Sequence, residues 1–159
     1  MLMRLAFVCS MAPLLAAALA AAQVPQKPQP PAPTPPGGAA ALARIAKGDM
    51  SGVQTTRQVT VRTAAEWQKL WKEHSPDEKM PAVDFNSHMV VGVFLGSKPS
   101  AGYQVEILNV RPEDNDLVVE YAQKQPGRGM MTAQMLTEPY DLVAVPKHAG
   151  PVRFVAVSR

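Results

Sequence analysis

Cysteine is nearly absent from this sequence, and charged residues are scarce. The only cysteine is Cys9, near the start of a chain of 159 residues, so the chain cannot form a disulfide within itself. Charged residues make up 18% of the chain, and the basic ones are scattered rather than gathered into runs among aromatic residues. A nucleic-acid partner is therefore not predicted, although the formal net charge is +3. The length is sufficient for one modest globular domain.

The chain begins with the features of a secretory signal peptide. Arg4 supplies a positive start, and residues 5–20 form an apolar run that is too short to span a bilayer comfortably. Ala20 and Ala22 provide the small residues that favour cleavage after position 22. Cys9 lies inside the apolar run and not after it, which argues against lipid attachment. We therefore expect a periplasmic or secreted protein that has no thiol and no membrane contact after cleavage.

Proline is concentrated just after the predicted signal. Seven prolines lie between Pro25 and Pro36. Each fixes its φ angle and removes a backbone donor, so this stretch favours an extended polyproline II conformation over a packed element. We interpret it as a spacer, and a ligand for a proline-binding groove is the alternative. The predicted organisation is then a signal peptide at residues 1–22, a disordered proline-rich linker at 23–42 and one domain at 43–159.

One helix is predicted at about residues 63–74. Thr63 and Glu66 fit a capping box, in which each side chain bonds the backbone N–H of the other residue. The apolar positions follow at helical spacing, namely Trp67, Leu70 and Trp71. We expect this apolar face to pack on the core of the domain. Pro76 ends the helix, because the residue before a proline avoids the helical conformation.

The rest of the domain has the pattern of a mainly β fold. Strands are predicted at residues 58–62, 89–95, 103–111, 117–122, 133–136, 142–145 and 152–157. Residues 89–95 are apolar nearly throughout, which predicts a central strand that is covered on both faces, with the helix on one of them. Turn-forming residues separate the strands, so we expect a small antiparallel β-sandwich-like domain with its strands in a meander.

No residue pattern predicts catalysis. Ser97 and Ser100 are not set in a Gly-x-Ser-x-Gly elbow. The carboxylates that could be considered are Asp84, Glu106, Asp116 and Glu120. No two of them stand out as an acid/base couple. Those in the predicted strands occupy the polar positions of the alternating pattern, so we expect these carboxylates simply to face solvent. We therefore predict no catalytic residue, and the chain is not expected to be an enzyme.

No metal or other cofactor is predicted either. The three histidines are His74, His88 and His148, and no two of them have metal-ligand spacing. We expect them to be solvated or to cap a helix end. Six methionines lie after the predicted signal, and their thioethers suit a soft ion such as Cu(I). Core filling or an adaptable contact surface is the favoured interpretation of these methionines.

Three loops punctuated by glycine and proline form the candidate partner-binding site. They span residues 97–102, 126–130 and 137–140. Each alone is compatible with an ordinary connection, but loops that share one end of a sandwich often form a binding surface. The candidate binding residues are Lys98, Pro99, Ser100, Ala101, Gly102, Tyr103, Gly127, Arg128, Gly129, Met130, Pro139 and Tyr140. Tyr140, Met130 and Met131 are expected to supply apolar contact area.

A longer stretch of the sequence resembles a known family. The residues that carry the likeness are Trp67, Pro81–Phe85 (PAVDF), Val90–Tyr103 (VVGVFLGSKPSAGY) and Ile107. Over roughly residues 63–157 the chain is similar to the PrcB C-terminal domain family, named after a surface protein that associates with a serine protease complex. The resemblance implies an exported accessory domain, a protease-complex subunit without catalysis of its own. Unlike some relatives, this chain has no cysteine placed for lipid attachment.

The loop motifs carry a second, shorter likeness. In the order found in the chagasin family, the sequence has Lys98–Tyr103 (KPSAGY), Gly127–Gly129 (GRG) and Glu138–Tyr140 (EPY). Chagasin-type proteins are immunoglobulin-like inhibitors that block cysteine proteases with three loops, so this resemblance implies inhibition. Glu138 stands where that family has arginine, and Tyr140 where it has tryptophan or phenylalanine.

Three functions are therefore open. The leading hypothesis is an exported, non-catalytic protein-binding domain that serves as an accessory or stabilising subunit of an envelope protease complex. The first alternative is a chagasin-like protease inhibitor that acts through loops 97–102, 126–130 and 137–140. The second alternative is an envelope domain that binds a small ligand or a metal.

Overall fold

The computed structural model describes residues 42–158, which contain one helix and seven strands. In chain order the elements are β1 (Ala43–Gly48), β2 (Thr56–Val61), α1 (Ala64–His74), β3 (His88–Leu95), β4 (Gln104–Glu113), β5 (Asp116–Lys124), β6 (Tyr140–Pro146) and β7 (Val152–Val157). The predicted signal peptide and nearly all of the predicted linker lie outside the described residues. Within residues 42–158 no helix is long and apolar enough to cross a membrane.

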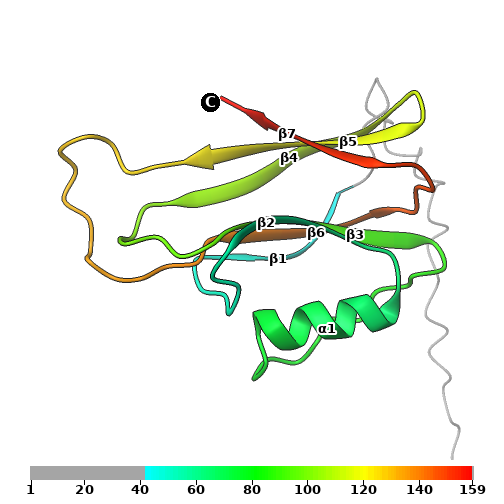
Figure 1. Ribbon diagram of the computed structural model, residues 1–159, viewed down its shortest axis with the longest axis horizontal. Helices are drawn as coiled ribbons and strands as arrows, with labels where there is room; N and C mark the ends of the chain where they lie inside the picture. The colour runs from blue at the N-terminus through cyan, green and yellow to red at the C-terminus, as the bar shows by residue number, and fades with distance from the viewer. Residues whose placement is uncertain (1–41, 159) are drawn as a thin grey trace, which may run out of the picture. The chain divides into compact units, whose positions relative to one another are not determined.

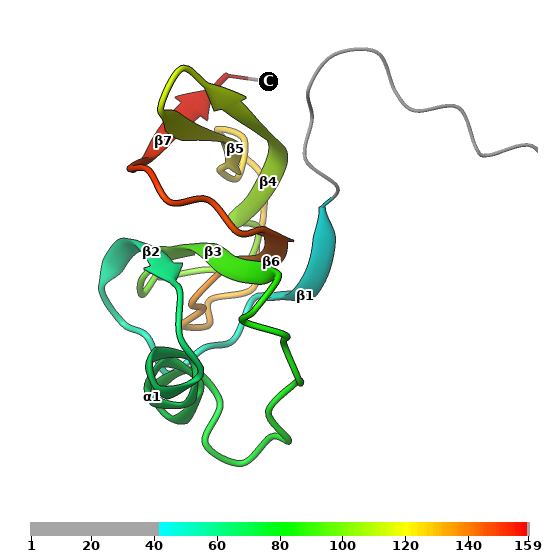
Figure 2. The ribbon, with the colours of Figure 1, turned by 90° about the vertical axis from the view of Figure 1, so that its right-hand side faces the viewer.

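The strands form two sheets that pack face to face, and the helix covers the outer face of one of them (Figure 1). The first sheet has the order β1-β6-β3-β2 and is antiparallel throughout. The second sheet has the order β4-β5-β7, in which β4 and β5 are antiparallel and β5 and β7 are parallel. Figure 2 shows the same three layers from the side. The predicted mainly β, sandwich-like fold with one helix is confirmed.

The strands do not follow one another as a meander, so this part of the prediction was wrong. β6 lies between β1 and β3, and both of its edges are occupied. The next strand, β7, therefore finds no free edge beside β6 and pairs with β5 in the second sheet. Such a crossing leaves no local trace in the sequence, because hydrophobic alternation reports which face of a strand is buried and not which strand lies beside it.

Strand β3 is the centre of the fold, as its apolar sequence predicts. It lies between β6 and β2, and every residue from Met89 to Leu95 is buried. Because successive side chains of a strand point to opposite faces, β3 contributes to two cores. Met89 and Val91 pack between the two sheets, whereas Val90 and Phe94 pack against the helix.

Helix α1 begins and ends where the sequence predicts. The Thr63 hydroxyl accepts a hydrogen bond from the Glu66 N–H, and the Glu66 carboxylate accepts one from the Thr63 N–H, which completes the capping box. Trp67 and Trp71 are buried in the core between the helix and the first sheet. Their indole N–H groups each donate to a backbone carbonyl in the connection between α1 and β3, both at 3.0 Å. The connection is thereby held against the helix.

Two elements differ from the sequence prediction. Residues 133–136, predicted as a strand, form none and lie in the long connection between β5 and β6. Strand β1 was not predicted, and it pairs with β6 at the edge of the first sheet. The side chains of β1 are exposed or half-buried, so the apolar pattern that marks the inner strands is weak there.

Candidate partner-binding site

Two loops lie side by side at one end of the sandwich (Figure 1). One consists of residues 96–103 between β3 and β4, and the other of residues 125–139 between β5 and β6. Lys98 and Thr137 exchange two backbone hydrogen bonds, of 2.7 and 3.0 Å, across them. We refer to these two loops together as the rim.

The connection between β1 and β2, residues 49–55, holds the rim from one side. The Ser97 N–H donates to the Gln54 carbonyl at 2.9 Å, and the Glu138 N–H donates to the Asp49 carbonyl at 2.7 Å. Each of the two rim loops is therefore bonded both to the other loop and to this connection. Backbone bonds of this kind fix the parts of the rim next to Lys98 and Thr137 in the absence of a partner.

Gly96 and Gly102 are required for this arrangement. Their φ angles are +67° and +95°, which residues with a side chain rarely adopt. A Cβ on Gly96 would lie 2.6 Å from the Gln54 carbonyl oxygen, and one on Gly102 would lie 3.2 Å from the Pro126 side chain. The first rim loop can therefore approach both the β1–β2 connection and the start of the second rim loop. The three predicted loops are together at one end of the sandwich.

The predicted binding residues differ in how accessible they are. Those exposed to solvent are Pro99, Gly102, Gly127, Arg128, Gly129 and Met130. Those that are half-buried are Lys98, Ala101 and Tyr103. Those that are buried are Ser100, Pro139 and Tyr140. Ser100 has an internal role, because its carbonyl accepts a hydrogen bond from the Thr137 hydroxyl at 3.2 Å.

Tyr140 does not supply contact area at the rim, which corrects the expectation from the sequence. It is the first residue of β6 and packs in the core between the first sheet and the helix, 9% exposed and with its ring centroid 4.2 Å from that of His74. Glu138 and Pro139 are also buried, and the Glu138 carboxylate accepts a hydrogen bond from the Ser97 hydroxyl at 3.1 Å. The third chagasin-like motif is thus enclosed in the protein and cannot enter a protease cleft without local unfolding.

The second rim loop exposes a group of large apolar side chains. Met130 and Met131, predicted to supply contact area, are 67% and 101% exposed. Met135 and Leu136 are 48% and 61% exposed, and sequence reasoning missed them because it placed residues 133–136 in a strand. Large apolar side chains gathered on a surface are typical of a contact site for another molecule, and methionine adapts its shape to a partner.

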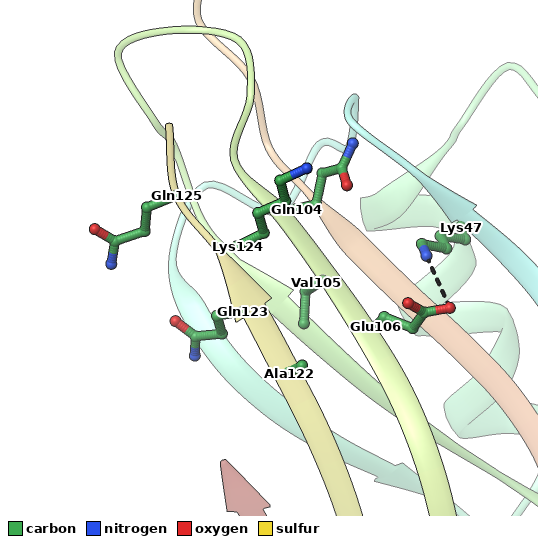
Figure 3. A pocket seen from close by; sticks show the side chains of 8 residues that line it. All are labelled: Lys47, Gln104, Val105, Glu106, Ala122, Gln123, Lys124 and Gln125. Carbon is green, nitrogen blue, oxygen red and sulfur yellow. Dashed lines mark ion pairs between the residues drawn. The ribbon is translucent and has the colours of Figure 1, made fainter. Parts of the chain in front are cut away.

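A hollow of about 420 Å³ opens at the base of the rim, where the loops join β4 and β5 (Figure 3). Its lining consists of Lys47, Gln104, Val105, Glu106, Ala122, Gln123, Lys124 and Gln125. The Lys47 ammonium lies 3.3 Å from the Glu106 carboxylate, so these two charges offset each other. Within residues 42–158 the Lys124 side chain and the three glutamine side chains of the lining have no hydrogen-bond or ion-pair partner.

A buried carboxylate joins the two sheets near the rim. Asp141 on β6 is fully buried, and its carboxylate accepts a hydrogen bond of 2.7 Å from the Ile107 N–H of β4. Arg44 on β1 donates to both carboxylate oxygens, at 3.0 and 3.1 Å, and to the Ile107 carbonyl at 3.0 Å. Burial raises the pKa of Asp141, and the Ile107 N–H and the Arg44 guanidinium oppose this rise. Sequence reasoning missed Asp141 because the residues that surround it are distant in the chain.

His74 is buried and not solvated, which corrects another expectation. It is 2% exposed, because it follows Trp71 by three positions and so lies on the same face of the helix. Its Nδ1 lies 2.8 Å from the Ser51 hydroxyl, and its Nε2 has no hydrogen-bond partner among the residues that the structure describes. The ring therefore acts mainly as part of the core between the helix and the first sheet.

The stability of the domain is expected to fall below about pH 6.5, and His74 is the cause. Burial lowers the pKa of His74, and the Glu78 carboxylate opposes this only in part. The unfolded chain then binds a proton at pH values at which the folded domain does not. The free energy of unfolding should decrease, by at most about 1.4 kcal/mol per pH unit, until the folded-state pKa is reached. Urea denaturation at several pH values measures this slope, and an unchanged slope in the His74→Phe variant would refute the assignment.

The described residues offer no evident metal site. Within residues 42–158 no group of three or more His, Cys, Asp or Glu side chains is arranged to hold a metal ion. The other two histidines each have a neighbour within the domain. His88 Nδ1 lies 2.7 Å from the Ser87 hydroxyl, and His148 Nε2 lies 3.0 Å from the Asn115 carbonyl.

Comparison with known protein families gives a match within the described residues. Residues 89–146 match the sequence family described as PrcB C-terminal, which confirms the resemblance to that family predicted from the sequence. This segment runs from β3 to the last residue of β6 and contains both rim loops. Searches of curated proteins and of solved structures gave no match.

Proposed function

We propose, on the premise that residues 89–146 belong to the PrcB C-terminal family, that this chain is a non-catalytic accessory subunit of an envelope protease complex. It binds the protease through the rim and prolongs its lifetime. One observation carries the proposal: the family segment contains the whole rim, and the rim bears the two most exposed large apolar side chains of residues 42–158, Met131 and Met130. Export rests on the signal peptide predicted at residues 1–22.

The physical state of the rim supports a binding role. Its two loops are joined by the Lys98–Thr137 backbone bonds, which lowers the conformational entropy that is lost when a partner docks. The exposed methionine side chains can adjust to the surface of the partner. Because the Glu138–Tyr140 motif is buried, this domain could offer only two of the three loops that a chagasin-type inhibitor uses. The accessory role needs no insertion into an active-site cleft.

Affinity capture tests the proposal. The full chain with a C-terminal tag is recovered from an envelope extract of its own cells, and the captured proteins are treated with a fluorophosphonate probe that labels active-site serines. We expect a labelled protease with the wild-type chain and at least about tenfold less with Met130→Ser/Met131→Ser, which removes apolar contact area. Met80→Ser is the matched control, because Met80 is 39% exposed but lies in the connection between α1 and β3.

The same captured complex separates the accessory role from inhibition. We expect the labelled protease to hydrolyse a peptide substrate at an unchanged rate per active site and to lose activity more slowly than the protease alone. Equal capture by the rim double variant and the wild type would count against the rim as the binding surface. Stoichiometric loss of activity of a papain-like protease on addition of the chain would replace the accessory role with inhibition.

A further inference from the structure

Unpaired positive charge lies close in the chain to the exposed methionines. Between Glu120 and Glu138 the sequence contains no aspartate or glutamate, while Lys124 and Arg128 both lie in this stretch. Both basic side chains are exposed, and neither forms an ion pair with another residue of the described range 42–158. The contact surface therefore carries a local positive charge that the domain itself does not neutralise.

The acidic groups of the rim and the hollow are already engaged. Glu138 is 7% exposed, and its carboxylate accepts a hydrogen bond from the Ser97 hydroxyl. Glu106 lies 3.3 Å from the Lys47 ammonium and 3.7 Å from the Arg44 guanidinium. Neither carboxylate is therefore available to Lys124 or Arg128.

The hollow adds a carboxamide that suits a peptide main chain. Gln104, Gln123 and Gln125 line it, and Figure 3 shows the Gln123 and Gln125 carboxamides directed away from Gln104. Gln104 is the direct partner of Lys124 in the β4–β5 register, so these two side chains share one face of the sheet. A carboxamide both donates and accepts hydrogen bonds, as the peptide groups of an extended segment require. A phosphate of a lipid headgroup or of a nucleic acid offers acceptors alone. The lining therefore favours a peptide over a membrane surface.

We propose that the rim and the hollow bind an extended segment of a partner protein in which carboxylates alternate with apolar side chains. The carboxylates pair with Lys124 and Arg128, the apolar side chains contact Met130 and Met131, and the main chain of the segment bonds to the Gln104 carboxamide, which shares a face with Lys124. This inference deepens the proposed function and rests on it for the identity of the partner as a protease subunit. Exposed apolar area alone does not select among partners, whereas complementary charge does.

Fluorescence anisotropy with defined peptides tests this chemistry. The probes are three short fluorescein-labelled peptides in which leucine alternates with glutamate, with lysine or with serine. We expect the full chain to bind the glutamate probe at least about tenfold more tightly than the lysine probe, with the serine probe in between. Binding of the glutamate probe should weaken as salt is added, because exposed charges are screened.

Charge reversal at the rim supplies the second arm of the test. Lys124→Glu/Arg128→Glu is expected to weaken binding of the glutamate probe at least about tenfold and to improve binding of the lysine probe. Lys69→Glu/Lys72→Glu makes the same change of net charge on the exposed face of α1 and should bind as the wild type does. All four substituted side chains are exposed, so both variants are expected to fold, and circular dichroism checks this.

The inference is overturned if the glutamate and lysine probes bind equally, if no probe binds saturably, or if the α1 control loses as much affinity as the rim variant. Vesicles of phosphatidylglycerol that bind through Lys124 and Arg128 while no peptide binds would assign the surface to a membrane instead. The proposed function is judged separately. If a labelled protease is captured through Met130 and Met131 but the probes show no charge preference, only the inference about charge fails.

Discussion

The Trp67→Ala variant is expected to lose about 3–5 kcal/mol of its free energy of unfolding. Trp67 is 1% exposed in the core between α1 and the first sheet. Its indole N–H also donates to the Pro81 carbonyl at 3.0 Å, so the truncation leaves both a cavity and an unpaired acceptor. Because small domains are stable by only about 5–15 kcal/mol, this change would bring the domain close to unfolding.

Urea denaturation of three variants checks this expectation. Trp67→Phe retains much of the ring but lacks the N–H, so its loss of stability should lie between those of the wild type and Trp67→Ala. Gln68→Ala changes an exposed neighbour on the same helix and should leave the midpoint within experimental error. If Trp67→Ala unfolds at the same urea concentration as the wild type, the helix is not part of the cooperative unit.

Replacement of Asp141 by alanine has the second large expected effect. We expect this variant to lose about 2–3 kcal/mol of its free energy of unfolding. The variant leaves the buried Ile107 N–H without its acceptor and removes the link between the two sheets next to the rim. The Arg44 side chain is 41% exposed, so water can solvate the guanidinium and the loss stays below that of a fully buried pair. Asp141→Asn retains an acceptor oxygen, so this variant should lose less unfolding free energy than Asp141→Ala.

The pH dependence of the Asp141→Asn variant tests the electrostatic part of this account. Burial raises the pKa of Asp141 above its ordinary value of 3.8. The Asp141 carboxyl group therefore binds its proton more tightly in the folded domain than in the unfolded chain. Protonation of Asp141 stabilises the folded domain fully below about pH 3.8, and this contribution is lost as the pH rises through the folded-state pKa. The stability of the wild type relative to Asp141→Asn should therefore decrease from acidic to neutral pH. Growth of this difference over the same range would show that the Arg44 and Ile107 contacts dominate over burial.

Much of the fold could be predicted because it follows from short-range rules. The Thr63–Glu66 capping box marks the start of α1, and the spacing of its tryptophans marks the buried face. The unbroken apolar run at residues 89–95 identifies the central strand, since a strand covered on both faces needs apolar residues at every position. Edge strand β1 was missed for the opposite reason, because half of its surface faces solvent and its pattern is weak.

The candidate site could be predicted only in part. Its glycines and prolines mark the loops, and Gly96 and Gly102 indicate positions where positive φ is needed. Exposure within the loops could not be predicted. Tyr140 lies inside the domain and Leu136 lies outside, although both are apolar residues in a stretch without a clear period.

The sequence by itself determined the mainly β class, the position of the single helix, the central strand and the likeness to the PrcB C-terminal family that residues 89–146 bear out. Only the tertiary structure decided that the rim loops are bonded to each other, that His74 and Asp141 are buried, and that β7 joins the second sheet. Capping and hydrophobic periodicity act between residues a few positions apart, so one sequence displays them. Burial and strand pairing depend on which distant segments meet, and those contacts are set when the whole chain packs.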